Sequence, residues 1–415
     1  MKLMGKFNMK IRKADIMGAL IFGFLFICIF FPGDPYNVKL VFFFLACILG
    51  IRIFIFQMRK GRYGYVLIMG IFYPIAIASC SFILTGGASE AISGAYPAAL
   101  LLLVILVREY GIPYEKYMML LLQVMAAATI MIVVLDFIGL ISVNGSSFLR
   151  DSFYRYGMGL MGKSPAYAAY YKVFFKASPL LLVLLPYCFE KNKFFMAGVT
   201  FVALVFSGTR ANIFVAAIIF LFGCFNAWSE NKDYYKWKLS FGILILAGLA
   251  GCLPFIFELV LKMMSTAGAV SSDAVRAGQY ASFMFVFSDS IKLICGMGFG
   301  SEFYDMGRMA YSAASEISYF DLLRKIGLIW FVPFLFFIIR PFFWKIGIHL
   351  KAAYMGYLLA ATTNPLLYSS TAYVLYIYLY THERKQKGQI LDGQYFKGKR
   401  SCQGGDWIYS RKHTG

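Results

Sequence analysis

An arginine between two apolar runs is the strongest candidate for chemistry in this sequence. Arg210 lies in the short polar turn FSGTRAN, residues 206–212, and apolar segments precede and follow it. A guanidinium at the edge of an apolar segment is costly unless it is paired, so it is a functional-site candidate by default. Its planar set of N–H donors matches the oxygens of a phosphate group. The turn therefore indicates a phosphate or pyrophosphate site, and the alternative is a side chain that only extends towards water.

A second set of candidates lies between residues 276 and 327. It begins with Arg276 in RAGQY and continues with CGMGFGS at residues 295–301. Gly296, Gly298 and Gly300 could let the backbone approach a substrate closely. Without a preceding strand, however, their spacing is weak evidence for a phosphate loop and fits a turn equally well. Glu316 stands just before an apolar segment and is a candidate general base, or it complements the dipole of a helix N-terminus.

Further basic and aromatic candidates occur in segments that we expect to face outwards. Arg150 and Arg155 lie in the first long polar segment and Arg308 lies in the second, where each either binds substrate or is only solvated. Tyr319, in the motif SEISYFDLLRKIG that begins at residue 315, is a candidate for substrate contact. Asp34, in the segment PGDP, fits a turn better than a catalytic role.

The sequence predicts neither a metal site nor another cofactor. His349, His382 and His413 are scattered, so they assemble neither a metal cluster nor a Ser-His-Asp arrangement. The eight cysteines show no CxxC spacing, which argues against a zinc site or a redox pair. Any chemistry must therefore come from the arginines, the carboxylates and the substrate itself.

The elements that hold these residues are predicted to be membrane-spanning helices. Of the 415 residues, 60% are apolar and 14% are charged, whereas a soluble domain carries roughly 25% charged residues. The apolar residues fall in long blocks that do not alternate with polar residues, which favours helices over a barrel. The net charge of +20 resides mostly in short segments between these blocks, so no nucleic-acid partner is expected.

We expect an all-α, polytopic membrane protein with about twelve spans. The predicted spans are 15–31, 38–57, 64–84, 96–107, 117–138, 173–189, 194–207, 211–227, 239–258, 326–340, 347–366 and 367–380. Residues 1–380 form the membrane domain, with long outer loops at 139–172 and 259–325, and residues 381–415 form a basic tail that we expect to be disordered. Lys and Arg are absent from the short segments 32–37 and 85–95, which places both termini in the cytoplasm.

These features together resemble the superfamily of O-antigen polymerases (Wzy) and O-antigen ligases (WaaL). The resemblance covers the multi-span layout, the turn SGTRAN, and a large late outer loop with an Arg followed by GxGxG. It also covers a polar residue, Glu316, eleven positions before the Gly that opens the next span. Ligases typically have His-Asn where this chain has Glu316-Ile317, and this departure favours the polymerase branch.

The resemblance implies a GT-C-like membrane glycosyltransferase in the bacterial inner membrane, with a periplasmic active site. Its substrates would be undecaprenyl-pyrophosphate-linked oligosaccharides, joined into O-antigen for lipopolysaccharide. Arg210 and Arg276 would hold the donor pyrophosphate, and Glu316 would be the general base. Membrane lipids, a chain-length regulator and a flippase are the expected partners.

Two alternatives remain open at this point. An O-antigen ligase shares the donor but attaches glycan to the lipid A core, and the sequence does not reveal the acceptor. A flippase of lipid-linked sugars would place charge along a path through several spans. Charge within the predicted spans is sparse, with Arg52 and Asp136 the main cases, which disfavours the transporter.

Overall fold

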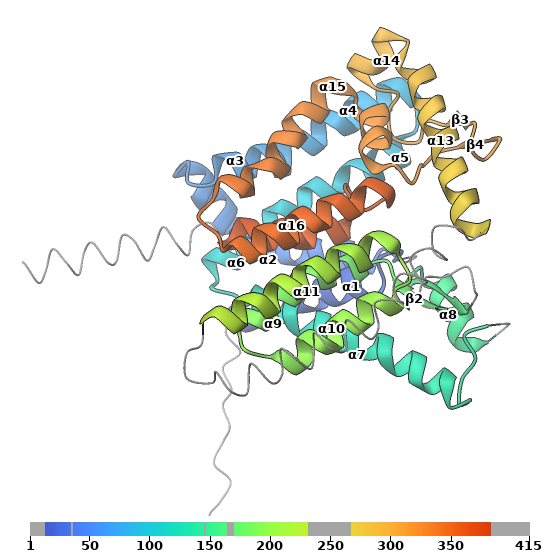
Figure 1. Cartoon of the computed structure of the whole chain (residues 1–415). Coiled ribbons are helices and arrows are strands. Elements are labelled where there is room, and N and C mark those ends of the chain that lie inside the picture. The colour runs from blue at the N-terminus through green and yellow to red at the C-terminus, as the bar shows by residue number, and fades with distance from the viewer. Residues whose placement is uncertain (1–12, 35, 145–146, 164–169, 231–266, 383–415) are drawn as a thin grey trace, which may run out of the picture.

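A computed structural model describes residues 13–34, 36–144, 147–163, 170–230 and 267–382, and these are mostly helical (Figure 1). Six helices are long and apolar enough to cross a membrane. They are Lys13–Phe30 (α1), Val38–Arg59 (α2), Gly64–Thr85 (α3, η1 and α4), Ala88–Glu109 (α5, η2 and α6), Tyr114–Phe137 (α7) and Ser318–Phe343 (α15 and η4). The chain is therefore a helical membrane protein.

The remaining described elements are shorter. They are α8 (Phe148–Arg155), β1 (Gly159–Lys163), β2 (Tyr171–Phe175), η3 (Ser178–Leu180), α9 (Leu181–Glu190), α10 (Phe194–Phe206), α11 (Arg210–Glu230), α13 (Ala267–Phe287), α14 (Ser290–Cys295), β3 (Phe303–Asp305), β4 (Ala310–Ser312), α16 (Ile348–Ala360), η5 (Ala361–Thr363) and a last helix at residues 370–382. α9, α10, α11 and α16 pack against one another and run along a common direction in Figure 1.

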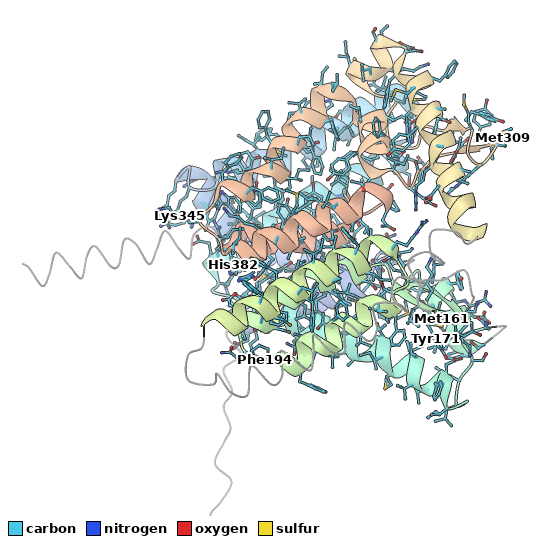
Figure 2. The ribbon with its side chains drawn as sticks, in the orientation of Figure 1. Met161, Tyr171, Phe194, Met309, Lys345 and His382 are labelled. Atoms are coloured by element: carbon cyan, nitrogen blue, oxygen red, sulfur yellow. The ribbon has the colours of Figure 1, made fainter. Side chains whose placement is uncertain are left out.

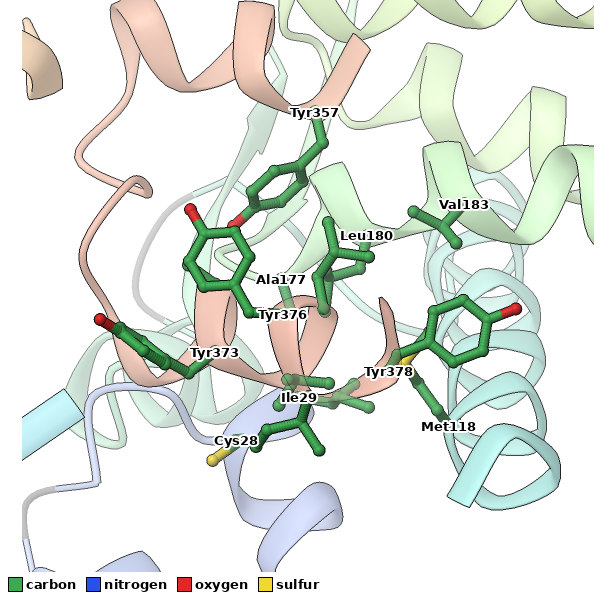
Figure 3. Packing of buried hydrophobic residues seen from close by; sticks show 14 of the residues in the cluster. Cys28, Ile29, Met118, Ala177, Leu180, Val183, Tyr357, Tyr373, Tyr376 and Tyr378 are labelled. Atoms are coloured by element: carbon green, nitrogen blue, oxygen red, sulfur yellow. The ribbon is translucent and has the colours of Figure 1, made fainter. Parts of the chain in front are cut away.

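The last helix, residues 370–382, lies at the centre of the core. Its residues 372–380 are all buried, and Figure 3 shows Tyr373, Tyr376 and Tyr378 among side chains from other helices. Tyrosine hydroxyls bond to carbonyl groups here: Tyr376 donates to Leu367 at 3.0 Å, and Tyr380 donates to Phe337 at 3.0 Å. Because hydrocarbon offers polar groups no water, these bonds satisfy hydroxyls that would otherwise be costly to bury.

The outward surface of α2 is apolar, as expected for a helix that faces lipid. Val41, Phe44, Ile48 and Ile55 are each about half exposed or more, and their spacing of three, four and seven residues places them on one side of a helix. Such a surface would be unfavourable in water.

The bundle has two distinct ends (Figure 2). Met161, Tyr171 and Met309 lie at one end, which we name the loop end, and Phe194, Lys345 and His382 lie at the opposite end. At the loop end, β1 pairs with β2 and β3 pairs with β4, both antiparallel. Both long polar segments of the sequence thus reach the same end.

Asp136 fixes the first of these segments to the bundle. Its carboxylate lies 2.7 Å from Lys163 Nζ and accepts a hydrogen bond of 2.7 Å from the Tyr171 hydroxyl. It also accepts from the backbone N–H of Val143 at 2.9 Å. Asp136 is the penultimate residue of α7, so this charge lies at the helix end and anchors β1 and β2.

The structure refines several sequence predictions. The expected helical membrane fold is confirmed, and two small two-stranded sheets are added to it among the described residues. The predicted loop 85–95 is helical from residue 88 and joins the span predicted at 96–107, because small residues such as those in ASEAISGA form helices as well as turns. The predicted loop 139–172 contains α8, β1 and the start of β2.

One predicted span boundary is also wrong. The span at 173–189 begins as strand β2, and its helical part is Ser178–Glu190, because a short apolar run does not distinguish strand from helix. The span predicted at 326–340 matches the part of α15 that follows the break at Gly327, and a further helical segment from Ser318 precedes that break. The span predicted at 239–258 and the tail from residue 383 lie outside the described residues.

A fully buried arginine ties α15 to the second polar segment. Arg324 donates to Asp321 Oδ1 at 2.9 Å, to the Ser301 carbonyl at 3.0 Å and to the Ala313 carbonyl at 3.0 Å. Its guanidinium carbon also lies 4.6 Å from the centre of the Phe303 ring. This side chain therefore joins both ends of the segment 301–313 to the start of the span.

We predict that Asp321→Asn destabilises the protein by about 3–5 kcal/mol, because a buried guanidinium loses its charged partner. Thermal unfolding of the detergent-purified protein measures this as a lower midpoint temperature. Asp289→Asn is the matched control, since Asp289 is exposed and pairs with Lys292 at 3.3 Å. Equal midpoints for the two variants would contradict the assigned role.

Candidate functional site

Arg210 and Arg276 meet at a shared carboxylate at the loop end. Arg210 Nη2 lies 3.4 Å from Asp273 Oδ1, and Arg276 Nη1 lies 3.1 Å from the same oxygen. Arg210 is the first residue of α11, whereas Asp273 and Arg276 are one turn apart on α13. The two arginines are thus 66 positions apart in the sequence (276 − 210) and close in space.

Glu316 extends this contact to a third arginine. Its Oε2 lies 3.6 Å from Arg276 Nη2, and its Oε1 lies 3.1 Å from Arg308 Nη2. The residues alternate in charge in the order Arg210, Asp273, Arg276, Glu316 and Arg308, and we name them the arginine chain. All five side chains are between 26% and 59% exposed, so a ligand can reach them. Ion pairs at this exposure contribute little stability and can be exchanged for contacts to an anion.

Buried hydrogen bonds hold the scaffold of the arginine chain in place. The Gln279 amide is fully buried on α13; it donates to Asp305 Oδ2 at 2.7 Å and accepts from the Ser315 hydroxyl at 2.8 Å. The other Asp305 oxygen accepts from the backbone N–H groups of Gly307 and Arg308. Gln279 therefore links α13 to the turn that carries Arg308 and to the residue before Glu316.

Close backbone packing completes this scaffold. A Cβ added to Gly278 on α13 would lie 2.4 Å from the Gly307 Cα atom, so only glycine permits the observed approach. Gly208, in the turn before Arg210, has φ +69°, which glycine adopts without strain. A Cβ there would lie 3.2 Å from the Lys172 side chain on β2. The turn SGTRAN is thus packed against strand β2.

Lys172 is a further cation near the arginine chain. Burial lowers the pKa of its ammonium below the usual value, and the negative charge of Glu316 opposes this shift. Lys172 therefore lies within electrostatic reach of the same carboxylate that pairs with Arg276 and Arg308. Four cations, from β2, α11, α13 and the β3–β4 turn, converge on this end of the bundle.

The structure places the other predicted site residues away from this chain of contacts. Arg150 and Arg155 lie on α8, where Arg150 is 5.7 Å from the Tyr154 ring and Arg155 is exposed. The Tyr319 hydroxyl donates to the Leu358 carbonyl on α16 at 3.2 Å. Asp34, the turn residue, accepts from the backbone N–H groups of Val38 and Lys39 at the start of α2.

The glycine-rich segment packs against the protein's own helices. A Cβ on Gly296 would lie 2.6 Å from the Gly327 nitrogen, and one on Gly298 would lie 2.8 Å from Thr85 Cγ2. A Cβ on Gly300 would lie 2.7 Å from the Glu90 side chain. All three glycines have φ between +82° and +87°, so they form the tight turn that the sequence allowed as the alternative.

Sequence reasoning missed Asp273, Lys172 and Gln279. Asp273 had a detectable signal, because it stands three positions before Arg276 on a helix, where opposite charges pair. Lys172 was missed as a candidate because residues 171–175, which form strand β2, were predicted to be the end of a loop and the start of a membrane span. Gln279 had no local signal, since its partners are 26 and 36 positions away.

Neither the family models nor the searches of curated proteins and solved structures give a match for this chain. The described residues contain no group of three or more His, Cys, Asp or Glu side chains that could hold a metal ion.

We predict that Glu316→Gln lowers the pKa of Lys172 further, because the charge that opposes the burial effect is removed. A lysine with a lower pKa becomes a neutral, nucleophilic amine at a lower pH. The pH dependence of Lys172 acetylation, measured by mass spectrometry, should therefore shift to lower pH in the variant. Glu302→Gln, which changes an exposed glutamate of the same segment, should leave the profile as it is in the wild type. A shift to higher pH in Glu316→Gln would contradict this arrangement.

Proposed function

We propose that this protein is a polysaccharide repeat-unit polymerase of the O-antigen type, a membrane glycosyltransferase that uses undecaprenyl-pyrophosphate-linked glycan. One observation carries the proposal: Arg210 and Arg276 point at one small anionic group, the Asp273 carboxylate. Paired guanidinium groups suit the bidentate recognition of phosphate oxygens. The resemblance in sequence motifs to the polymerase family supports the same substrate class.

Binding of the donor would exchange one anion for another. The pyrophosphate of the lipid-linked glycan would replace Asp273 between Arg210 and Arg276, because it carries more charge and more acceptor oxygens. Arg276 would then turn from Glu316 towards the pyrophosphate, which frees Glu316 Oε2 for another partner. Arg308 would continue to hold Oε1.

Transfer of the glycan would then follow in one step, a nucleophilic substitution at the anomeric carbon of the donor sugar. A hydroxyl oxygen of the lipid-linked acceptor attacks the anomeric carbon of the donor glycan, and the bond from that carbon to the pyrophosphate oxygen breaks. The hydroxyl proton passes to Glu316 as general base. The bonding electrons leave with undecaprenyl pyrophosphate, whose developing charge the two arginines stabilise.

The proposed setting is the bacterial inner membrane, with about twelve spans in a GT-C-like arrangement. Both termini would be cytoplasmic and the loop end periplasmic. The six long apolar helices, and the gathering of both long polar segments at one end, support this topology. Lipid-linked oligosaccharides and membrane lipids are the proposed partners, and a chain-length regulator and a flippase would act beside the enzyme.

We predict that Arg210→Ala and Arg276→Ala each abolish long-chain glycan without changing the amount of protein in the membrane. Arg210→Lys should restore little, because an ammonium cannot make a bidentate contact. The measurement is the glycan ladder on gels from a deletion strain complemented with each variant. Arg155→Ala is the matched control, since it removes an exposed arginine at the same end of the bundle.

Three ladder patterns separate the candidate functions. A polymerase leaves core with one repeat unit and no ladder when it is deleted. Core without any repeat unit, together with accumulated lipid-linked polymer, would identify a ligase instead. Near-normal polymer with Arg210→Ala would remove Arg210 from the mechanism.

We also predict that Asp273→Asn tightens the binding of inorganic pyrophosphate to the purified protein by about two- to tenfold. The reason is that the ligand no longer competes with two exposed ion pairs. Isothermal titration calorimetry in detergent measures the change, with Asp289→Asn as the control carboxylate. Weaker binding after Asp273→Asn would show that Asp273 supports the ligand rather than occupying its place.

A further inference from the structure

A partly exposed tyrosine lies beside the arginine chain without being part of it. Tyr280 is 44% exposed on α13, and it follows Arg276 by four residues. Residues four positions apart lie on the same face of a helix and are separated by about 6 Å along its axis. Tyr280 therefore lies about one helical turn beyond Arg276, on the face of α13 that carries this arginine.

Two contacts join this face of α13 to the segment that begins at Glu316. The first is the ion pair between Arg276 and Glu316, whose Nη2 and Oε2 atoms are 3.6 Å apart. The second is between the rings of Tyr280 and Phe320, whose centres are 5.5 Å apart with the ring planes at 86°. The two contacts are four residues apart on both segments, so the Tyr280 ring adjoins the ion pair.

A small aromatic core holds the Tyr280 ring in position. Phe320 packs against Phe283 with ring centres 5.8 Å apart, and Phe283 packs against Phe303 with ring centres 5.2 Å apart. Phe283 and Phe303 are buried. Aromatic rings prefer such edge-to-face and offset-stacked arrangements. The Tyr280 ring is thus supported from the protein side, while part of its surface stays open to a ligand.

An aromatic ring next to guanidinium groups suits a ligand in which a sugar is joined to a phosphate. The ring gives the C–H groups of a sugar an apolar surface to pack against, and the hydroxyl end of a tyrosine tolerates water. The neighbouring guanidinium groups of Arg210 and Arg276 match phosphate oxygens. A ligand that uses both contacts must hold its sugar within about 6 Å of its phosphate, as a sugar diphosphate does.

A tyrosine that only anchors a protein at the membrane interface would have a different setting. Such anchors are common because the tyrosine ring suits the headgroup region of the bilayer. An anchor needs neither an ion pair beside it nor a fixed ring orientation. Tyr280 has both, since Arg276 and Glu316 pair next to it and Phe320 packs against its ring. The setting therefore favours a sugar ligand over a membrane anchor.

We propose that Tyr280 binds the sugar that is joined directly to the donor pyrophosphate. This inference rests on the proposed function, which assigns the donor pyrophosphate to Arg210 and Arg276. The sugar packs against the Tyr280 ring, while its pyrophosphate is held one helical turn away at Arg276. Tyr280 thereby fixes the orientation of the sugar whose anomeric carbon is attacked.

The first test compares two probes on the full-length protein in detergent, undecaprenyl pyrophosphate with and without the repeat-unit glycan. The glycan-bearing lipid is extracted from a strain that lacks this protein, and isothermal titration calorimetry measures both affinities. We expect Tyr280→Ala to weaken the binding of the glycan-bearing lipid by about three- to tenfold, the range for one lost aromatic contact. The affinity for undecaprenyl pyrophosphate alone should stay within about twofold of the wild type, because Arg210 and Arg276 remain.

Three further variants control this test. Tyr280→Phe keeps the ring and should bind both lipids as the wild type does. Tyr280→Leu keeps an apolar side chain against Phe320 but removes the flat ring, so it should behave as Tyr280→Ala does; its thermal unfolding midpoint verifies that the fold is kept. Tyr36→Ala removes a tyrosine that is 72% exposed between α1 and α2, and it should change neither affinity.

The outcomes separate this inference from the proposed function. Equal losses of affinity for both lipids in Tyr280→Ala would overturn the sugar contact in favour of a contact to the lipid. Unchanged binding in Tyr280→Ala, together with loss of both lipids in Arg276→Ala, would overturn this inference and leave the proposed function standing. If only the glycan-bearing lipid is lost in Tyr280→Ala while Arg276→Ala binds normally, the sugar contact is supported and the arginine assignment is contradicted.

The second test measures polymerisation with the donor and the acceptor varied separately. Tyr280→Ala should raise the KM for the donor by about three- to tenfold and leave the KM for the acceptor within about twofold of the wild type. A rise in the acceptor KM alone would show that Tyr280 binds the other substrate, and the assignment to the donor would then be wrong.

Discussion

The absence of water in the hydrocarbon of a membrane is the constraint on which this structure depends. Each polar group within the bundle must find its partner in the protein. In the central helix at residues 370–382, the hydroxyls of Tyr376 and Tyr380 meet this demand by donating to carbonyl groups. The charge of Asp136 lies near the end of α7 and pairs there with Lys163. The interior thus supplies stability, and the loop end gathers the partly exposed ion pairs.

This division explains why the candidate site combines a rigid scaffold with adaptable ion pairs. Gln279 and Arg324 are fully buried, and their hydrogen bonds fix α13, the β3–β4 turn and the start of α15 relative to one another. The arginine chain lies on this scaffold with its side chains partly exposed. A ligand can therefore exchange with Asp273 without disturbing the buried bonds that set the positions of Arg276 and Glu316.

The sequence was sufficient to predict the helical membrane class and to select Arg210, Arg276 and Glu316, which the structure brings together. Arg210 was selected because a guanidinium beside apolar segments is costly, whereas Arg276 and Glu316 were selected from their places in the late polar segment and from the family resemblance. The boundaries of the membrane spans were harder to predict. Residues 173–175 are apolar and belong to strand β2, although the same residue types also form helices. The roles of Gly296, Gly298 and Gly300 depend on Gly327, Thr85 and Glu90, which lie far away in the sequence. Contacts between residues so far apart in the sequence produce no local sequence pattern from which they could be predicted.

The arginine chain already contains the partners that an entering anion would replace. Asp273 and Glu316 lie between its three arginines, and Arg308 Nε also lies 3.8 Å from Asp305 Oδ2. Because these carboxylates balance the charge of the arginines, the binding of an anion there would be an exchange of partners with a small net change in charge. Exchange suits a ligand that must bind and leave, because the carboxylates can return.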